Sequence, residues 1–277
     1  MNYQEIARQA RIKVLDLIHK AGTSHIGSNF SIIDIMTVLF EKVDLNKDKV
    51  ILSKGWAAAS LYYFLWRKGR ITEEELNSFC MPDSKFIGLA ESMCKMIECP
   101  NCKGLVVGCL RCMNTRKIED RFIPIAGGSM GLGLPGAIGL ALGKKLKGEE
   151  GKVYVLMSDG EMQCGTTWES ALIAAHHKLD NLVVIIDKNE YQAMGKTQEI
   201  LNSYFPHTEP MNHSLRNGHD YEQIKRALNY NIKNIPLILV FETIKGKGVS
   251  FMENNNLWHY SHLSTEDYEK ALVELNR

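Results

Sequence analysis

The chain has 277 residues, a formal net charge of +1 and ordinary shares of hydrophobic (45%) and charged (23%) residues, which are typical of a soluble globular protein. This balance gives no basic surface for nucleic acid or an anionic membrane. No apolar run reaches the ~20 residues that span a bilayer. The start has amphipathic helical spacing and lacks the features of a signal peptide. We therefore expect a cytoplasmic protein with no nucleic-acid or membrane partner.

Short apolar runs alternate with helical patterns along the chain. Helices are predicted at residues 4–20, 31–42, 57–69, 72–79, 134–148, 165–178 and 220–230. Strands are predicted at residues 49–55, 153–157, 182–187 and 236–243. Continuous apolar strands separated by helices indicate a parallel sheet that is buried on both faces. We therefore expect one α/β domain over residues 1–277, with helices on both faces of the sheet and a small cysteine-rich insertion at about 80–124.

Two helix starts carry capping residues. Asn29 or Ser31 is expected to cap the helix at 31–42, and Thr72 the helix at 72–79.

Polar residues follow the predicted strands, at the edge where parallel sheets bind ligands. Asp159 follows one strand and Asn189 follows the next, so both are expected at the same edge. A carboxylate and an amide oxygen suit Mg²⁺ or Ca²⁺, and Mg²⁺ commonly takes further ligands from phosphates. The alternative is structural, with Asp159 as a helix cap and Asn189 in a turn.

A glycine-rich stretch at 126–143 enters a predicted helix. Its glycines let backbone N–H groups approach a phosphate at the helix N-terminus. Gly131, Gly133 and Gly136 also satisfy G-x-G-x-x-G, with Asp159 about 20 residues further on, as in dinucleotide-binding proteins. A nicotinamide- or flavin-dependent oxidoreductase is therefore an alternative. The glycines are equally suited to close helix packing.

Five segments taken together resemble the thiamine-diphosphate-binding half of transketolase, and specifically the N-terminal subunit of split transketolases. In chain order they are TSHIGSNFSIIDIMTVLF, ILSKGWAAASLYYFL, GGSMGLGLPGAIGLALGKKL, SDGE…DKN and TIKGKGVSFMENNNLWHY. The resemblance covers about residues 5–262 and is poor at about 80–124. It implies the thiamine-diphosphate-binding (PP-type) fold and outweighs the single dinucleotide motif.

The resemblance also implies roles for particular residues. Asp159, Asn189 and the main-chain carbonyl of Tyr191 would hold Mg²⁺ or Ca²⁺. His25 and His259 would be catalytic, since histidines can donate to a developing oxyanion and move protons. The further cofactor-binding residues would be Gly128, Met130, Gly160, Glu161 and Trp56.

Family resemblance implies a partner as well. The glutamate that protonates the cofactor's aminopyrimidine belongs, in the family, to a pyrimidine-binding domain that this chain lacks. We therefore expect the partner to be a C-terminal transketolase subunit, in an α₂β₂ heterotetramer.

Two residues depart from the family pattern. Trp56 replaces the histidine of S-K-G-H, which reshapes the donor-substrate pocket because indole has an N–H donor but no base. Cys164 replaces the glutamate of a carboxylate network between the two active sites, while Glu169 is retained.

Six of the seven cysteines lie between residues 80 and 112. In a cytoplasmic chain such a cluster favours metal or reactive thiols over disulfides. Cys99, Cys102, Cys109 and Cys112 form two C-x-x-C pairs that suit a structural Zn²⁺. A redox pair, an iron–sulfur cluster and free thiols are the alternatives. The loop replaces the family's substrate-loop histidine, so it would reshape acceptor access or dock a carrier protein.

The sequence therefore predicts the diphosphate-binding subunit of a two-component, thiamine-diphosphate-dependent transferase. It would move a two-carbon ketol unit from a ketose phosphate to an aldose, a branched-sugar precursor or a carrier-bound thioester. A synthase or 2-oxoacid dehydrogenase component fits the last segment less well. A cofactor-binding scaffold without activity, or a partner-docking module, remains the alternative beside the oxidoreductase.

Overall fold

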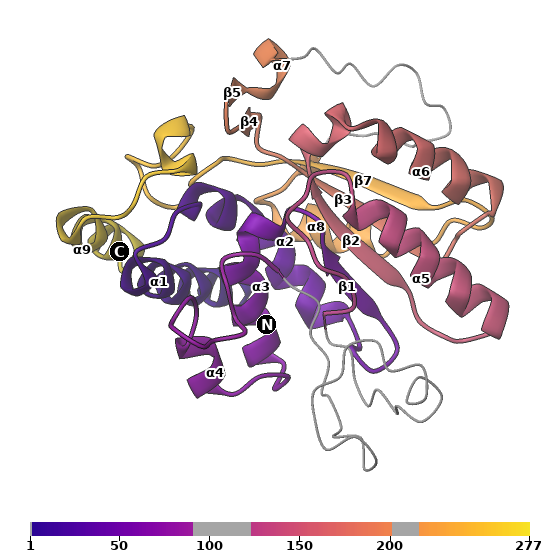
Figure 1. Cartoon of the computed structure of the whole chain (residues 1–277), viewed down its shortest axis with the longest axis horizontal. Helices are drawn as coiled ribbons and strands as arrows, with labels where there is room; N and C mark the ends of the chain where they lie inside the picture. Colours follow the sequence, from indigo (N-terminus) through magenta and orange to yellow (C-terminus); the bar gives the residue numbers. More distant parts are fainter. Residues whose placement is uncertain (1, 91–122, 201–215) are drawn as a thin grey trace.

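A computed structural model describes residues 2–90, 123–200 and 216–277. Its main sheet has five parallel strands in the order β1-β2-β3-β7-β6 (Figure 1). The strands are β1 (Lys49–Leu52), β2 (Val153–Ser158), β3 (Leu182–Lys188), β7 (Leu237–Glu242) and β6 (Arg216–Asn217). A short antiparallel pair, β4 (Tyr191–Gln192) and β5 (Gly195–Lys196), follows β3. The four predicted strands and their parallel arrangement are confirmed.

Helices cover both faces of the sheet. The α-helices are α1 (Tyr3–Ala21), α2 (Ile26–Lys42), α3 (Ala58–Arg67), α4 (Glu73–Asn77), α5 (Gly133–Lys147), α6 (Gly165–His176), α7 (Thr197–Ile200), α8 (Tyr221–Leu228) and α9 (Thr265–Leu275). Three 3₁₀ turns are η1 (Gly55–Ala57), η2 (Asp159–Gln163) and η3 (Asn256–His259). Figure 1 shows α5 and α6 on one side of the sheet and α1, α2 and α3 on the other.

The apolar strands are continuous because each of their faces meets a separate core. Tyr154 and Leu156 of β2 point into a core shared with α1, α2, α3 and α8. Val155 and Met157, which alternate with them, point into a second core shared with α5. A strand that is buried on both sides has no polar alternation, which is why the pattern predicts a parallel sheet.

Helix ends follow local chemistry in some places and tertiary contacts in others. Thr72 caps α4 with a capping box to Glu75, as predicted. The predicted start of α2 is wrong, because the helix begins at Ile26, with His25 in a left-handed conformation at its N-cap. Asn29 and Ser31 lie inside the helix and bond to other segments instead. Helix α9, which packs against α1, has no counterpart among the predicted elements.

The predicted irregular segment at 80–124 is only partly described. Residues 80–90 contain no helix or strand. Cys99, Cys102, Cys109 and Cys112 lie outside the described residues, so the zinc site stays a prediction. Within the residues that the structure describes, no helix is both long and apolar enough to cross a membrane.

A buried polar cluster joins α1, α2 and α8 on one side of the sheet. Asp34 of α2 accepts two hydrogen bonds from Arg11, at 3.0 and 2.7 Å. Tyr221 Oη donates to the same carboxylate at 2.9 Å, and His219 Nδ1 lies 2.6 Å from it. Burial opposes ionisation of Asp34, but Arg11 and His219 hold the pKa of this carboxyl well below its usual range. The cluster reaches the loop that follows β7, because His219 Nε2 accepts from the Ile244 N–H at 2.8 Å.

Removal of the Asp34 carboxylate tests this cluster. We expect Asp34→Ala to lower the free energy of unfolding by about 3–5 kcal/mol, because Arg11 then stays buried without its partner. Urea unfolding followed by circular dichroism measures the loss. Asp16→Ala on α1 is the control, since Asp16 makes only a surface pair with Lys20 and should lose under ~1 kcal/mol. Equal losses in the two variants would contradict the assignment.

Candidate active site

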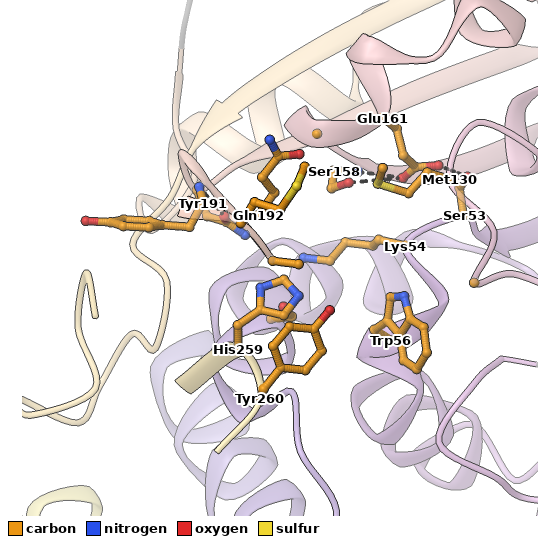
Figure 2. Close-up of a pocket in the computed structure, with 16 residues that line it drawn as sticks. Ser53, Lys54, Trp56, Met130, Ser158, Glu161, Tyr191, Gln192, His259 and Tyr260 are labelled. Atoms are coloured by element: carbon orange, nitrogen blue, oxygen red, sulfur yellow. Dashed lines mark hydrogen bonds between the residues drawn. The ribbon is translucent and has the colours of Figure 1, made fainter. Parts of the chain in front are cut away.

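A cavity of about 260 Å³ opens at the carboxyl ends of β1, β2 and β3 (Figure 2). Eight of the ten predicted cofactor-binding and catalytic residues line it, namely Trp56, Gly128, Met130, Gly160, Glu161, Asn189, Tyr191 and His259. The other two are His25, which stacks on Trp56, and Asp159, which precedes Gly160. The predicted residues therefore converge on one place, although they come from segments far apart in the chain.

A buried ion pair joins two strands at the carboxyl edge of the sheet, where the cavity opens. Lys54 Nζ, just beyond β1, pairs with Asp187 Oδ2 in β3, and both side chains are almost fully buried. Ser31 donates to Asp187 Oδ2 at 2.7 Å, and Thr243 donates to Asp187 Oδ1. Burial alone would raise the pKa of Asp187, but the charge and hydrogen bond of Lys54 lower it. The pair ties β1, β3, α2 and the end of β7 together.

Asp159 and Asn189 lie where the strand ends place them. Asp159 Oδ2 accepts from the Glu190 N–H at 3.0 Å, while the buried Oδ1 has no hydrogen-bond partner among the described residues. Asn189 Oδ1 accepts from the Tyr191 N–H at 3.1 Å, and Nδ2 donates to Ser31 at 3.2 Å. Ser158 rather than Asp159 caps the following turn. The helix-cap alternative for Asp159 is therefore wrong. The turn alternative for Asn189 holds, and its amide oxygen, which has two lone pairs, can accept this bond and still bind a cation.

These oxygens fit a divalent cation. Burial, aided by the nearby charge of Asp187, raises the pKa of Asp159 to about 6. A cation beside the unpartnered Oδ1 would compensate this buried carboxylate. Three or more His, Cys, Asp or Glu side chains do not gather at a possible metal site anywhere in the described ranges. An ion here would therefore need the Asn189 amide and a main-chain carbonyl such as that of Tyr191.

Glu161 organises the cavity wall. Its Oε1 accepts from Ser53 Oγ and from the Gly131 N–H at 3.2 Å, and its Oε2 accepts from the Ser158 N–H at 2.8 Å. Burial raises the pKa of Glu161. Since both oxygens are occupied, this carboxylate joins the glycine-rich turn to the ends of β1 and β2 within the cavity lining.

The glycines of G-x-G-x-x-G pack closely against their surroundings. A Cβ at Gly131, where φ is +78°, would lie 2.5 Å from Thr166 Oγ1, and one at Gly133 would lie 2.3 Å from Ser53. A Cβ at Gly136 would lie 2.3 Å from Ile125. These three glycines serve the packing alternative. Gly160 differs, because a Cβ there would meet its nearest neighbours only at 3.5 Å or more, beside the cavity.

His25 and His259 face each other across one wall of the cavity. Their rings meet edge to face at 5.2 Å, and His25 stacks on Trp56 at 4.5 Å. Burial, with the charge of Lys245, lowers the pKa of His25 to about 4 and that of His259 to about 3. Lys245 Nζ lies 2.9 Å from His259 Nδ1. Both imidazoles are therefore neutral near pH 7.

Three further residues belong to the site. Lys54 and Lys245 follow strands and lie within two of the segments that resemble the family, which are the sequence signals that mark them. Lys245 is fully buried, and burial lowers its pKa to about 7. Gln192 lines the cavity beside Gly160. No sequence pattern distinguishes Gln192 from an ordinary loop residue.

The departures from the family pattern differ in position. Trp56 lines the cavity and exposes much of its indole. Cys164 is half-buried at the start of α6, where burial raises the pKa of its thiol, and Glu169 is exposed.

Residues 2–275 match the family model described as "Transketolase, thiamine diphosphate binding domain". The chain belongs to the transketolase family. It is a thiamine-diphosphate-dependent transferase, and the oxidoreductase hypothesis is wrong.

This transketolase-family chain matches transketolase subunits of similar length and also part of longer transketolases. It is 31% identical to an apulose-4-phosphate transketolase subunit of Actinobacillus succinogenes, over 99% of this chain and 97% of the relative. It is 28% identical to the 6-deoxy-6-sulfo-D-fructose transketolase subunit SqwG of a Clostridium species, over 100% and 97%. Human transketolase is 28% identical over 98% of this chain, which spans 42% of that protein. The transketolase structure from Campylobacter jejuni superposes with a TM-score of 0.82 at 27% identity, covering 100% of this chain and 43% of the other.

The neutral histidines predict how stability depends on pH. An unfolded histidine has a pKa near 6.5, so between about pH 4 and 6.5 the unfolded chain binds more protons than the folded chain. The histidines therefore make the free energy of unfolding fall as the pH is lowered across this range. We expect His25→Gln and His259→Gln each to reduce that slope by up to about 1 kcal/mol per pH unit.

Urea unfolding at several pH values measures the slopes. His177→Gln, at an exposed position after α6, is the control, and the comparison separates the two histidines from all other titrating groups. Slopes identical to that of the control would show that His25 and His259 are not held neutral.

Proposed function

We propose that this chain is the diphosphate-binding subunit of a two-component transketolase, which transfers a two-carbon ketol unit from a ketose phosphate to an acceptor. The observation that supports this most is that Asp159 Oδ1, beside Asn189 and Tyr191 at the end of the sheet, makes no hydrogen bond within the described ranges. In the proposed holoenzyme, Asp159, Asn189 and the Tyr191 carbonyl hold Mg²⁺ or Ca²⁺. Gly160, Gly128 and Met130 contact the cofactor.

Bound thiamine diphosphate supplies the nucleophilic carbon and the electron sink for C–C cleavage. The chain supplies proton donors and positions them. An ammonium group has donors only, so the Lys245 ammonium donates to His259 Nδ1 and leaves the ring proton on Nε2. Figure 2 shows the His259 ring between Tyr260 and Lys54 on the cavity wall. We propose that Nε2–H donates to a substrate oxygen as negative charge develops there.

His25 has the second position on this wall. Its Nδ1 lies 2.7 Å from Ser24 Oγ, and its ring is held between Trp56 and His259. The left-handed backbone at His25 and the bond from its N–H to the His259 carbonyl fix the two histidines relative to each other. We propose that His25 forms a hydrogen bond with a substrate hydroxyl, and that its imidazole takes the proton of this hydroxyl and returns it.

The partner closes the cavity in this proposal. Four large apolar side chains that line the cavity are exposed, namely Trp56 (42%), Met130 (48%), Tyr260 (59%) and Met194 (72%). A second chain that packs on them would exclude water from the site. The naming of two relatives as transketolase subunits and the 42% span of human transketolase favour a C-terminal transketolase subunit, in an α₂β₂ heterotetramer.

The acceptor is the open part of the proposal. Two relatives are named for sugar phosphate or sulfosugar substrates, which favours an aldose or a branched-sugar precursor over a carrier-bound thioester. The proposed structural zinc at Cys99, Cys102, Cys109 and Cys112, and a carrier protein docked there, depend on residues outside the described ranges.

Cofactor binding tests the proposed function. We expect thiamine diphosphate with Mg²⁺ to raise the melting temperature of the chain, and more so with its partner subunit, because a ligand of the folded state stabilises that state. Asp159→Ala should weaken the binding by about tenfold or more, because the ion loses its carboxylate ligand. Thermal-shift titration gives the affinities, and Asp16→Ala is the control. No metal-dependent shift in the wild-type protein, even with the partner, would contradict the proposal.

Trp56 tests how the substrate pocket is shaped. We expect Trp56→His to change the KM for the sugar substrates by about fivefold or more, because the smaller ring uncovers one face of His25 and can accept as well as donate. Steady-state assays of the two-subunit enzyme measure the effect, with cofactor affinity measured in parallel. Trp56→Phe, which keeps a flat apolar ring, should change KM less. Unchanged KM values in Trp56→His would mean that this position does not contact the sugars.

A further inference from the structure

Gln192 has a buried side-chain amide whose nitrogen has no partner in the part of the chain that the structure describes. It ends strand β4, lines the cavity and is 7% exposed. Its Nε2 makes no hydrogen bond to any of the described residues. Buried side-chain donors are nearly always paired, because an unpaired donor loses its water without compensation. Such a donor at the wall of a cavity indicates a ligand.

The amide lies against Gly160, at the end of β2. A Cβ built on Gly160 would lie 3.5 Å from Gln192 Oε1 and 3.6 Å from Gln192 Cβ, with Met130 Sδ at 3.9 Å. Figure 2 shows Gln192 beside Tyr191, with its amide directed toward Ser158 and Met130. A half-turn of the amide puts the NH₂ group in the place of Oε1, so the donors then face the side of Gly160 that has no side chain.

The backbone holds Gln192 in this place. Gln192 pairs with Gly195 in the β4–β5 hairpin, and the Tyr191 N–H before it donates to Asn189 Oδ1 at 3.1 Å. After the hairpin, the Thr197 N–H donates to the Glu190 carbonyl at 2.9 Å. The position of Gln192 is therefore coupled to Asn189, the residue that follows β3 of the main sheet.

Unpaired groups of both kinds occur at this point. Asp159 Oδ1, an acceptor with negative charge, also lacks a partner among the residues that the structure describes, and Asp159 directly precedes Gly160. A ligand that satisfies both groups needs a cation for the carboxylate and an acceptor for the amide. A metal-bound diphosphate has both, whereas a free metal ion or a free anion has one.

We infer that Gln192 is a further cofactor-binding residue, whose amide N–H donates to an oxygen of the metal-bound diphosphate beside Gly160. This inference rests on the proposed function. A neutral amide suits the position because it adds a donor without a second positive charge near the cation. It also distinguishes the diphosphate from thiamine itself, which has a single neutral hydroxyl in place of the charged phosphate oxygens.

Two substitutions test the inference in the full chain with its partner subunit. Gln192→Met keeps the length of the side chain and removes the donor, and it should weaken binding of thiamine diphosphate with Mg²⁺ about tenfold. Gln192→Glu places a carboxylate against the diphosphate and should weaken it about 100-fold. Gln4→Glu, the same change at an exposed position of α1, is the control and should leave the affinity within twofold.

Isothermal titration calorimetry with three probes separates the outcomes. Thiamine diphosphate with Mg²⁺ and inorganic pyrophosphate with Mg²⁺ should both lose affinity in the Gln192 variants, while thiamine alone should show no difference. Circular dichroism and the melting temperature without ligand establish that each variant is folded.

Affinities within twofold of the control in both Gln192 variants would overturn the inference and leave the proposed function intact. Tighter binding of Mg²⁺ or Ca²⁺ alone by Gln192→Glu would overturn it as well, because Gln192 would then be a metal ligand. Absence of binding in the wild-type protein would overturn the proposed function together with the inference.

Discussion

The carboxyl edge of the sheet depends on the buried ion pair between Lys54 and Asp187. A charge removed from water is tolerated only when partners satisfy it from several sides. Asp187 has such partners in Lys54, Ser31 and Thr243, and Asn189 Nδ2 lies 3.4 Å from it. Each partner comes from a different segment, so the ion pair can form only when α2 and the ends of β1, β3 and β7 are in register.

The ion pair positions other site residues through its neighbours in the chain, Ser53 and Asn189. Ser53 precedes Lys54 and donates to Glu161, which in turn accepts from the Gly131 N–H and fixes the glycine-rich turn. Asn189 lies two residues after Asp187 and holds Tyr191 through its Oδ1. Two hydrogen-bonded paths therefore lead from one ion pair to opposite walls of the same cavity.

Much of this arrangement could be predicted from the sequence, because strand ends are marked locally. Four apolar runs gave the parallel sheet, and the residues after them gave Asp159 and Asn189. The start of α2 was mispredicted because the left-handed backbone of His25 depends on a bond to the carbonyl of His259, 234 residues away. A local capping pattern contains no such information.

The burial of Lys245 and Gln192 near the cavity could not be predicted for the same reason, because it depends on contacts with distant segments. Lys245 looks like a solvated loop residue in the sequence, yet it is fully buried against His259. Gln192 has an unremarkable local sequence, and only the hairpin that places it on Gly160 gives it a role. The glycine motif left two alternatives open in the sequence, and the structure favours close packing, since its three glycines lie against Thr166, Ser53 and Ile125.

The two lysines set the chemistry of the cavity through their different surroundings. Lys54 has a carboxylate partner, so its charge is compensated within the sheet edge. Lys245 has an imidazole partner, and burial together with the charge of Lys54 lowers its pKa to about 7. Burial, aided by the residual positive charge of Lys245, lowers the pKa of His259 and of His25 and keeps both neutral.

A neutral imidazole that is held by a lysine can donate from its far nitrogen without carrying a charge of its own. Positive charge thus lies behind the donors on this wall, and the Asp159 carboxylate lies next to Gly160, which lines the cavity elsewhere. A ligand with a cation toward Asp159 and developing negative charge toward the histidines matches both walls. In the proposed function, the buried Lys245, which would be unfavourable in a simple core, is therefore the group that lets His259 donate from its far nitrogen.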